Sequence, residues 1–451
     1  MKTLFGTDGI RGRANRHPMT AMMALKLGMA VAALFRRRTK CPKVVIGKDT
    51  RLSCYMLESA IVSGTTAMGC HALLVGPLPT PGVAHLITTM RADGGVMISA
   101  SHNPYEDNGI KVFGGDGFKL DDPLELEVEA LMERMGCDDQ EFPVGKEMGH
   151  AIRVDDAVGR YASYLKLWFP REYSLEGMKI VCDAANGAAY KTAPIVFEEL
   201  GARCFVYGDA PNGMNINDRC GSMHPSLLQE KVIEHGADIG IALDGDADRV
   251  ILVDEKGNVV DGNAILYIAA RHFKATGRLH GDAIVTTTMA NMGLEVRLRE
   301  QGIGMLRTQV GDRYVVEQMR ATGVNLGGEP SGHVIFLDTN TTADGILTAL
   351  QMIAVMKRQQ KALSELACDL ELYPQVIVNV EVREKRPFEQ ITGFHELKAK
   401  MEERLAGKGR IDVRYSGTQR VARVMCEGED PGVVEETARE LADYLQKRVG
   451  S

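Results

Sequence analysis

Short apolar runs alternate with amphipathic stretches along the first 370 residues and predict a repeated α/β order. Uninterrupted apolar runs of four to eight residues indicate buried strands, whereas apolar residues at three- and four-residue spacing indicate helices. Strands are predicted at 43–49, 72–75, 96–98, 179–186, 204–207, 238–243, 250–253 and 283–287, and helices at 20–38, 56–69, 192–200 and 292–301, with two more beginning near 81 and 263. This alternation indicates right-handed βαβ units and mainly parallel sheets.

The pattern changes after residue 373. An alternating strand is predicted at 375–382, a charged helix at 387–405, strands at 410–415 and 422–427, and a helix from 431. We therefore predict an α/β fold class: three similar α/β domains with mixed or parallel sheets and a smaller C-terminal α+β domain. The predicted boundaries are 1–153, 154–255, 256–369 and 370–451.

Composition and charge exclude several classes of protein. The chain is 45% hydrophobic and 25% charged, with a net charge of −7, which argues against a general nucleic-acid binder. No apolar run approaches the ~20 residues that cross a bilayer. The nine cysteines are scattered without a CxxC pair, a pattern typical neither of a zinc site nor of a disulfide framework. We expect a cytoplasmic protein with neither nucleic acid nor membrane as partner.

A serine-containing loop follows the predicted strand at 96–98. The segment Ser99-Ala100-Ser101-His102-Asn103-Pro104 lies at the end of that strand, where ligands bind in α/β sheets. The hydroxyl of Ser101 could act as a nucleophile there. Ser-His-Asn-Pro is equally good turn chemistry, so the residues alone leave both interpretations open.

Three carboxylates follow the strand at 238–243. Asp244, Asp246 and Asp248 are separated by small residues, so their oxygens can converge on one hard cation, without which they would repel one another. An EF-hand is excluded because Arg249 stands where that loop requires glycine, and a strand follows at 250–253. A solvated acidic turn remains the alternative.

Three further segments carry polar groups in glycine-rich surroundings. Phe5–Gly12 predicts a loop with one arginine, Arg11. Gly328–His333 presents a carboxylate, a hydroxyl and an imidazole, a mixture that suits sugar hydroxyls, and Arg414–Thr418 offers groups that suit a phosphate dianion. An ordinary loop and a charged surface hairpin are the respective alternatives for the last two. Val310–Val315 (VGDRYV) is also predicted to be a loop.

Four of these loops, in this order, resemble those of the α-D-phosphohexomutases, and the resemblance covers nearly the whole chain. SASHNP resembles the family's phosphoserine loop, DGDADR its metal loop, GEPSGH its sugar loop and RYSGT its phosphate loop. The flanks FGTDGIRG, SHNPYEDNGIKVFGGDGFKL, VGDRYV and GGEPSGHVIFLDTNTTADG are most similar to the bacterial branch that acts on glucosamine phosphate. The resemblance implies four domains around a central cleft.

The resemblance also implies roles for individual residues. Ser101 is carried as a phosphoserine, and one Mg²⁺ per active site is held by its phosphoryl group and by Asp244, Asp246 and Asp248. The implied catalytic residues are Ser101, Lys111 as general base or acid, Arg11, Arg249 and His333. The implied substrate-binding residues are Glu329, Ser331, Arg414, Ser416, Gly417, Thr418 and Arg423.

Three residues stand apart from these implied roles. His102 is not expected to be a triad partner of Ser101, because neighbouring residues at a strand end point in different directions. It is expected to be structural or a neighbour of the phosphate that does not contact it directly. The chain departs from the family at Gln419-Arg420, where Glu-Pro is usual, and this change should make the phosphate loop more cationic.

The activity implied is the interconversion of glucosamine 6-phosphate and glucosamine 1-phosphate, with glucosamine 1,6-bisphosphate as intermediate and activator. The small-molecule partner is thus a sugar phosphate, and the product would feed UDP-N-acetylglucosamine and cell-wall synthesis. Three alternatives stay open: a phosphoglucomutase or phosphomannomutase, a metal-dependent sugar phosphatase in which water takes the phosphoryl group, and a non-catalytic sugar-phosphate binder. A homodimer and a mobile fourth domain are also left open.

Overall fold

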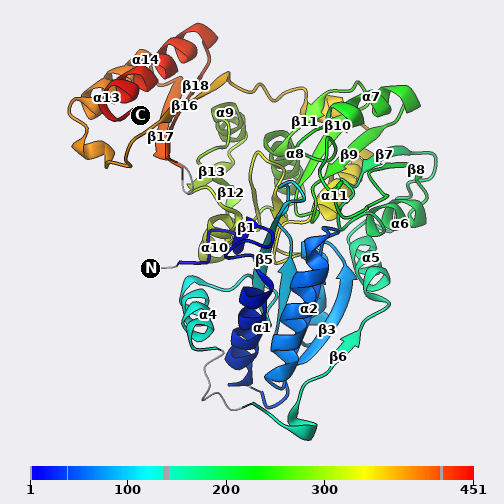
Figure 1. The fold of residues 1–451 in the computed structure, drawn as a ribbon. Helices are drawn as coiled ribbons and strands as arrows, with labels where there is room; N and C mark the ends of the chain where they lie inside the picture. The colour runs from blue at the N-terminus through cyan, green and yellow to red at the C-terminus, as the bar shows by residue number, and fades with distance from the viewer. Residues whose placement is uncertain (1–2, 38, 136–141, 417–419, 451) are drawn as a thin grey trace. The chain divides into compact units, whose positions relative to one another are not determined.

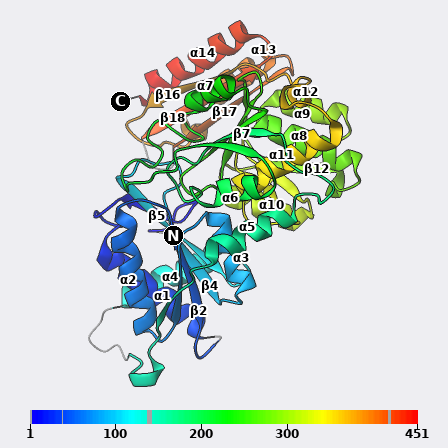
Figure 2. The ribbon, with the colours of Figure 1, turned by 90° about the vertical axis from the view of Figure 1, so that its right-hand side faces the viewer.

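The computed structural model describes residues 3–37, 39–135, 142–416 and 420–450 and divides into two compact units. The first unit is Met1–Thr287 with Leu306–Ala367, and the second is Thr288–Met305 with Cys368–Ser451. Figures 1 and 2 show the elements of both as ribbons.

A six-stranded sheet with helices on both faces begins the first unit (Figure 2). Its order is β1-β5-β4-β2-β3-β6, with β5 antiparallel to both neighbours and the remaining pairs parallel. The strands are β1 (Ile10–Arg13), β2 (Lys43–Lys48), β3 (His71–Pro77), β4 (Gly94–Ile98), β5 (Asp107–Gly114) and β6 (Ala151–Arg153). The helices are α1 (Ala21–Arg36), α2 (Ser53–Ala67), α3 (Thr80–Thr89), α4 (Asp122–Arg134) and α5 (Ala157–Leu167), with a 3₁₀ turn at Gly145–Glu147.

The two faces of this sheet pack against different helices because side chains alternate along each strand. Val44 and Ile46 share a core with α1 and α2. Gly47 faces Val83 of α3 on the opposite side. Thr20 caps α1 by accepting the N–H of Met23 at 3.3 Å, which confirms the predicted start of that helix.

Part of the segment expected to be a loop at Phe5–Gly12 is a strand, so that prediction is wrong. Ile10–Arg13 forms β1, which pairs with β5 at the edge of the sheet. The strand is short, and its hydrogen-bond partner lies about a hundred residues further along the chain, so the local pattern did not reveal it.

A five-stranded sheet follows in the order β11-β10-β9-β7-β8. Strands β7, β8 and β9 are parallel, and β9, β10 and β11 form antiparallel pairs. Its elements are β7 (Lys179–Asp183), α6 (Thr192–Glu199), β8 (Arg203–Tyr207), α7 (Ser226–His235), β9 (Ile239–Leu243), β10 (Val250–Asp254) and β11 (Val259–Val260). The tight β9–β10 connection therefore presents residues 244–249 at the carboxyl end of a buried parallel strand.

The third sheet has the order β13-β12-β14-β15. Its elements are α8 (Gly262–Ala275), a 3₁₀ turn at His280–Asp282, β12 (Ala283–Thr287), β13 (Gly304–Thr308), α10 (Asp312–Thr322), β14 (Leu326–Gly328), β15 (Val334–Phe336), α11 (Gly345–Gln359) and α12 (Leu363–Ala367). The prediction of a loop at Val310–Val315 is wrong beyond Gly311, because α10 begins at Asp312. Gly311, with a φ of 136°, marks the turn, and the helix starts directly after it.

The second unit is a three-stranded antiparallel sheet with helices. The strand order is β16-β18-β17. Its elements are α9 (Met292–Glu300), β16 (Gln375–Glu381), a 3₁₀ turn at Phe388–Gln390, α13 (Phe394–Arg404), β17 (Gly409–Tyr415), β18 (Val421–Gly428) and α14 (Pro431–Val449). The helix predicted from 387 begins only at Phe394, because Gly393 has a left-handed φ of 75°.

Three α/β sheets and a smaller α+β sheet confirm the predicted fold class. Among the described residues, no helix has both the length and the apolar character that a membrane span requires.

Candidate active site

Ser101 lies where buried strand β4 ends, on a loop with an unusual backbone. Its φ is 53°, and the residue is 1% exposed. The hydroxyl donates to Oδ2 of Asp244 at 2.6 Å, a residue on the β9–β10 connection. The loop after β4 and the loop after β9 therefore meet at this serine.

The expectation that the side chains of Ser101 and His102 point in different directions is wrong, whereas the structural or phosphate-neighbour role of His102 stays a prediction. Its Nδ1 lies 3.3 Å from Ser101 Oγ, because the left-handed backbone at Ser101 turns the two side chains toward one side. Burial, together with Arg249 and Arg11, lowers the pKa of His102 to about 4. The imidazole is therefore neutral beside the hydroxyl near pH 7.

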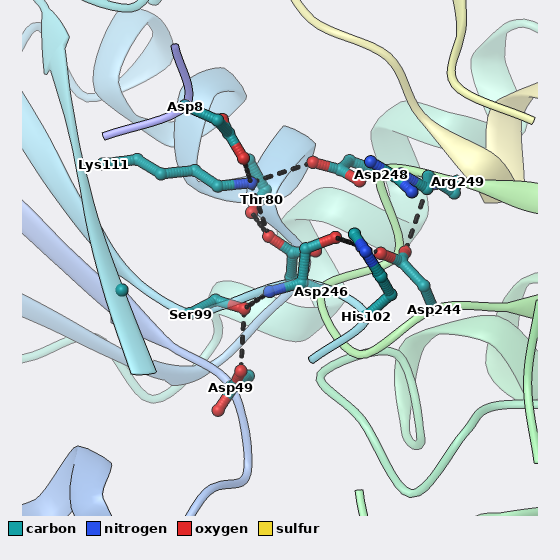
Figure 3. A network of polar contacts seen from close by, with 12 residues as sticks. Asp8, Asp49, Thr80, Ser99, His102, Lys111, Asp244, Asp246, Asp248 and Arg249 are labelled. Carbon is teal, nitrogen blue, oxygen red and sulfur yellow. Dashed lines mark hydrogen bonds and ion pairs between the residues drawn. The ribbon is translucent and has the colours of Figure 1, made fainter. Parts of the chain in front are cut away.

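Asp244, Asp246 and Asp248 are buried and face one another (Figure 3). One oxygen from each lies within 4.8 Å of the others. Oδ1 of Asp246 is buried without a hydrogen-bond partner, and Oδ1 of Asp248 has only His333 Nδ1 at 3.6 Å. Carboxylate oxygens that converge in this way fit a hard divalent cation, as the metal loop of the sequence predicts.

Gly245 permits the close packing that brings these loops together. A Cβ there would lie 2.5 Å from the carbonyl oxygen of Ser101. The backbones of the two loops are therefore in direct contact, and a side chain at this position would separate Ser101 from Asp244.

Lys111, on β5, supplies positive charge to the three carboxylates (Figure 3). Its Nζ donates to Oδ2 of Asp246 and Oδ2 of Asp248, each at 2.9 Å. Burial lowers the lysine pKa, but Asp246 and Asp248 outweigh it and raise that pKa well above its usual value. The side chain is therefore an ammonium in this arrangement.

The surroundings shift the pKa values of Asp244 and Asp248 in opposite directions. Burial, Asp248 and Asp246 raise the pKa of Asp244 to about 8. Burial also raises the pKa of Asp248, but Lys111 and His333 lower it well below the usual range. Asp246 is held from the other side by Thr80, whose hydroxyl donates to Oδ2 at 2.6 Å.

Arg11 and Arg249 lie at the edge of this group. Arg11, on β1, pairs with Asp8, and Arg249 donates its backbone N–H to Asp244 Oδ1 at 3.1 Å. The Nε atoms of both arginines are buried without a partner. Two guanidinium groups with spare donors suit a phosphoryl group.

His333 is held between two carboxylates. Its Nδ1 lies 3.6 Å from Asp248 Oδ1 and its Nε2 lies 3.3 Å from Asp312 Oδ2. Burial lowers the pKa of His333, but Asp248 and Asp312 outweigh it and raise the pKa to about 10. The imidazole is therefore protonated near pH 7.

Glu329 and Ser331 share the loop between β14 and β15 with His333. Glu329 accepts the N–H of Gly311 at 3.1 Å and the hydroxyl of Ser331 at 3.2 Å. Together with His333, this loop offers acceptors and donors, as the sugar loop of the sequence predicts.

The residues predicted to bind the non-reacting phosphate lie in the second unit. Arg414 on β17 and Arg423 on β18 are paired across the sheet. Ser416 is 9% exposed and donates its N–H to Val421 O at 2.8 Å. Arg420 is exposed and donates to Arg383 O at 3.5 Å. Gly417, Thr418 and Gln419 lie outside the described residues.

Several charged residues near these groups were missed by sequence reasoning. Asp8 contacts Arg11, Lys111 and Lys119, and Lys119 also pairs with Asp312. Burial raises the pKa of Asp8, but Lys111, Lys119 and Arg11 lower it to about 2. In the second unit, Lys385 donates to Ser416 O at 2.6 Å. Asp8, Lys119 and Asp312 all lie in segments that resemble the family, which was the signal available for them.

The comparisons with known proteins agree with this geometry. Family models described as phosphoglucomutase/phosphomannomutase domains I, II and III and C-terminal domain match residues 2–136, 160–257, 261–373 and 377–444. The chain is 54% identical over 450 residues to a phosphoglucosamine mutase of Citrifermentans bemidjiense, covering 100% of this chain and 99% of that protein. It is 51% identical over 451 residues to a phosphoglucosamine mutase of Bdellovibrio bacteriovorus, covering 99% and 98%.

Solved structures share the fold over nearly the whole chain. A phosphoglucomutase/phosphomannomutase family protein from Burkholderia thailandensis superimposes with a TM-score of 0.80 at 22% identity, covering 98% of this chain and 97% of that one. The N-acetylphosphoglucosamine mutase of Aspergillus fumigatus, in complex with GlcNAc-6P and magnesium, gives 0.68 at 18% identity, covering 99% and 96%. With family models on all four regions and full-length relatives above 50% identity, the chain belongs to the phosphoglucomutase/phosphomannomutase family.

Proposed function

We propose that the chain interconverts glucosamine 6-phosphate and glucosamine 1-phosphate by way of a phosphoserine at Ser101. The observation that carries the proposal is the 2.6 Å contact between the buried Ser101 hydroxyl and Asp244, one of three converging carboxylates. The full-length relatives named phosphoglucosamine mutase support glucosamine phosphate as the substrate.

The reaction consists of two phosphoryl transfers. In the first, the free sugar hydroxyl attacks phosphorus, the bond from phosphorus to Ser101 Oγ breaks, and glucosamine 1,6-bisphosphate forms. In the second, the bisphosphate presents its other phosphate, Ser101 Oγ attacks that phosphorus, and the bond to the sugar oxygen breaks. In each transfer the attacking hydroxyl loses one proton and the leaving oxygen gains one, so the protons balance.

Asp244, Asp246, Asp248 and a phosphoryl oxygen on Ser101 would hold Mg²⁺. The convergence of one oxygen from each aspartate within 4.8 Å and the unpartnered Oδ1 of Asp246 support this assignment. A bound Mg²⁺ neutralises the charge of the phosphoryl group and makes phosphorus more open to attack.

The positively charged side chains are assigned to the phosphoryl group and to the proton. Arg11 and Arg249 stabilise phosphoryl oxygens with their spare donors. Lys111, already an ammonium, gives a proton to the leaving oxygen and regains one from the attacking hydroxyl, and protonated His333 stabilises negative charge on the sugar side. These roles are supported by the burial of Lys111 and His333 near the carboxylates and by the buried Nε atoms of the half-buried Arg11 and Arg249.

Substrate contacts are assigned to two loops. Glu329 and Ser331 bind sugar hydroxyls and the amino group, for which a carboxylate is a suitable partner. The phosphate that does not react is bound by the cationic loop containing Arg414, Ser416, Gly417, Thr418 and Arg423.

The test is mutase activity of the Mg²⁺-supplied protein on glucosamine 6-phosphate, glucose 6-phosphate and mannose 6-phosphate, compared by kcat/KM. A clear preference for the amino sugar supports the proposal, whereas preference for a neutral hexose phosphate would place the chain with the phosphoglucomutases or phosphomannomutases. Release of free phosphate without isomerised sugar would identify a phosphatase instead.

Ser101→Ala should abolish turnover, because neither transfer can then pass through Oγ. The control is Asn325→Ala, a substitution remote from this loop. This variant should keep wild-type activity when it is compared with the wild type at equal folded fraction. Phosphopeptide mass spectrometry of the wild type should find phosphate on Ser101. Substantial activity in Ser101→Ala would overturn the mechanism.

A further inference from the structure

The loop that carries Ser101 is gathered around the fully buried guanidinium of Arg51. Arg51 is 0% exposed, and its Nη2 donates to Ser101 O at 2.9 Å and to Asn103 O at 2.8 Å. Its Nη1 donates to Asp107 O at 3.1 Å and also to Pro104 O. Backbone carbonyls turned away from water need donors, and one rigid guanidinium supplies them to three residues of the loop and to Asp107 at the start of β5.

Asp49 links the same guanidinium to the other end of the Ser101 backbone. Arg51 Nε donates to Asp49 Oδ2 at 2.8 Å. The same oxygen accepts the hydroxyl of Ser99 at 2.7 Å, a bond that Figure 3 shows. The Ser99 Oγ in turn accepts the N–H of Ser101 at 2.9 Å. Both polar backbone groups of Ser101 are therefore connected to one buried ion pair.

Asn217, in the connection between β8 and α7, reaches the loop from the second sheet. Its Nδ2 donates to Ser101 O at 2.9 Å and to Asn103 O at 3.0 Å. The carbonyl of Ser101 thus accepts from two side chains that come from different sheets. We call Arg51, Asp49 and Asn217 the loop anchor.

The loop anchor holds a backbone conformation that serine disfavours. L-residues rarely adopt a positive φ, and Ser101 has a φ of 53°. This conformation aims Oγ at Asp244, 2.6 Å away. Without the donors at its carbonyl, the loop could relax toward ordinary backbone angles and carry Oγ away from the carboxylates.

We propose that Arg51 and Asn217 are positioning residues that keep Ser101 Oγ in one place whether or not it carries a phosphoryl group. This inference rests on the proposed function, in which that group arrives and leaves in every turnover. Phosphorylation of Ser101 adds nearly two negative charges at Oγ. The anchor bonds go to backbone carbonyls and leave Oγ free, so they persist in both states.

The experiment compares Arg51→Lys and Asn217→Ala with the wild type. Lysine keeps the charge of Arg51 but lacks its fork of donors, and Asn217→Ala removes one pair of hydrogen bonds while Arg51 stays. Asn325→Ala is the matched control, because Asn325 is 2% exposed and donates to Arg278 O at 2.9 Å and Asp338 Oδ2 at 2.6 Å, away from the Ser101 loop. Three quantities are measured: kcat and KM for glucosamine 6-phosphate, the rate at which glucosamine 1,6-bisphosphate phosphorylates Ser101, and the melting temperature.

A misplaced reacting atom costs up to about 100-fold in rate, so we expect kcat to fall about tenfold in Asn217→Ala and about 100-fold in Arg51→Lys. The phosphorylation rate of Ser101 should fall by the same factors, and KM should stay near the wild-type value. Asn325→Ala should lower the melting temperature without changing either rate.

Wild-type rates in Asn217→Ala at matched folded fraction would overturn the anchor role, and so would a rise in KM with kcat unchanged. If Arg51→Lys does not fold, Asn217→Ala decides alone. If the wild type is active and phosphorylated on Ser101 while both variants keep wild-type rates, only the anchor role is overturned. A wild type that never carries phosphate on Ser101 overturns the proposed function and the anchor role together.

Discussion

Lys111 is the residue on which the stability of the three buried carboxylates depends when no cation neutralises them. Its ammonium group lies 2.9 Å from both Asp246 and Asp248 and is fully buried. Removing one partner of a buried ion pair costs about 3–5 kcal/mol, because the remaining charges are left without compensation. We therefore expect Lys111→Met to lower the melting temperature strongly in EDTA and to recover part of the loss when Mg²⁺ is added.

Lys48→Met provides the control for this prediction. Lys48 is similarly buried and pairs with Glu58 at 2.6 Å, so its loss should also destabilise the protein. Its response to Mg²⁺ should equal that of the wild type. An equal Mg²⁺ response in the Lys111 and Lys48 variants would contradict the role given to Lys111.

At the scale of single residues, the sequence could predict those residues that lie within recognisable loops. Ser101, the three aspartates and His333 all fall where local pattern and family resemblance place them. Asp8, Thr80 and Asn217 could not be assigned from local pattern, because their significance comes from partners far along the chain. Thr80 bonds Asp246, which is 166 residues away, and nothing in the sequence around Thr80 indicates that contact.

At the scale of elements, Asp344 connects two helices of the first unit. It caps α11 by accepting the N–H of Leu347 at 3.0 Å, and it accepts the hydroxyl of Tyr161 in α5 at 2.6 Å. Burial raises its pKa from 3.8 to about 6. Between these values the folded state holds a proton that the unfolded state has lost, so this group lowers stability as pH rises from 3.8 to about 6.

Asp344→Asn should remove this pH dependence, since asparagine does not ionise, while its Oδ1 can still accept the N–H of Leu347 and its Nδ2 can donate to the hydroxyl oxygen of Tyr161. Relative to the wild type, the variant should gain stability as pH rises through that window and keep a constant difference above it. Urea unfolding across the window measures this difference. A difference in free energy of unfolding that is independent of pH would contradict the raised pKa of Asp344.

The elements that sequence pattern predicted well are those whose burial is uniform. Strands β2, β4 and β9 are almost wholly buried apolar runs, and each was predicted near its observed position. Strand β1 was missed because its residues Ile10–Arg13 include one glycine and two arginines, so pairing with β5 decides its conformation. Tertiary contacts overrode the local pattern there.

At the scale of the whole molecule, each unit has a hydrophobic core of its own. Leu441 of α14 is fully buried in the core of the second unit, and Leu27 of α1 is 1% exposed in a core of the first. Truncating a buried leucine to alanine costs about 2–5 kcal/mol. We expect Leu441→Ala to lower one calorimetric transition and Leu27→Ala to lower the other. A single transition shifted equally by both changes would show that the units unfold together.

The domain boundaries at 153, 255 and 369 stay a prediction. They were placed from the order of helices and strands along the chain. That order does not reveal that Thr288–Met305 belongs to the second compact unit. The residues on both sides of this segment belong to the first unit. The local hydrophobic pattern does not show that the segment itself belongs to the second.

The placement of Thr288–Met305 limits how this chain can be recombined with its relatives. Asn291 exchanges hydrogen bonds with the backbone of Tyr373, with both distances 2.9 Å, and Arg410 donates to Ala290 O at 2.8 Å. A chimera joined once near residue 370 would therefore pair α9 of one parent with the terminal sheet of the other and break a matched surface. To exchange the second unit between two parents without breaking these contacts, the chimera needs three junctions, near 287, 305 and 367. The second unit is therefore encoded by two separate segments of the gene, although it is one compact unit in space.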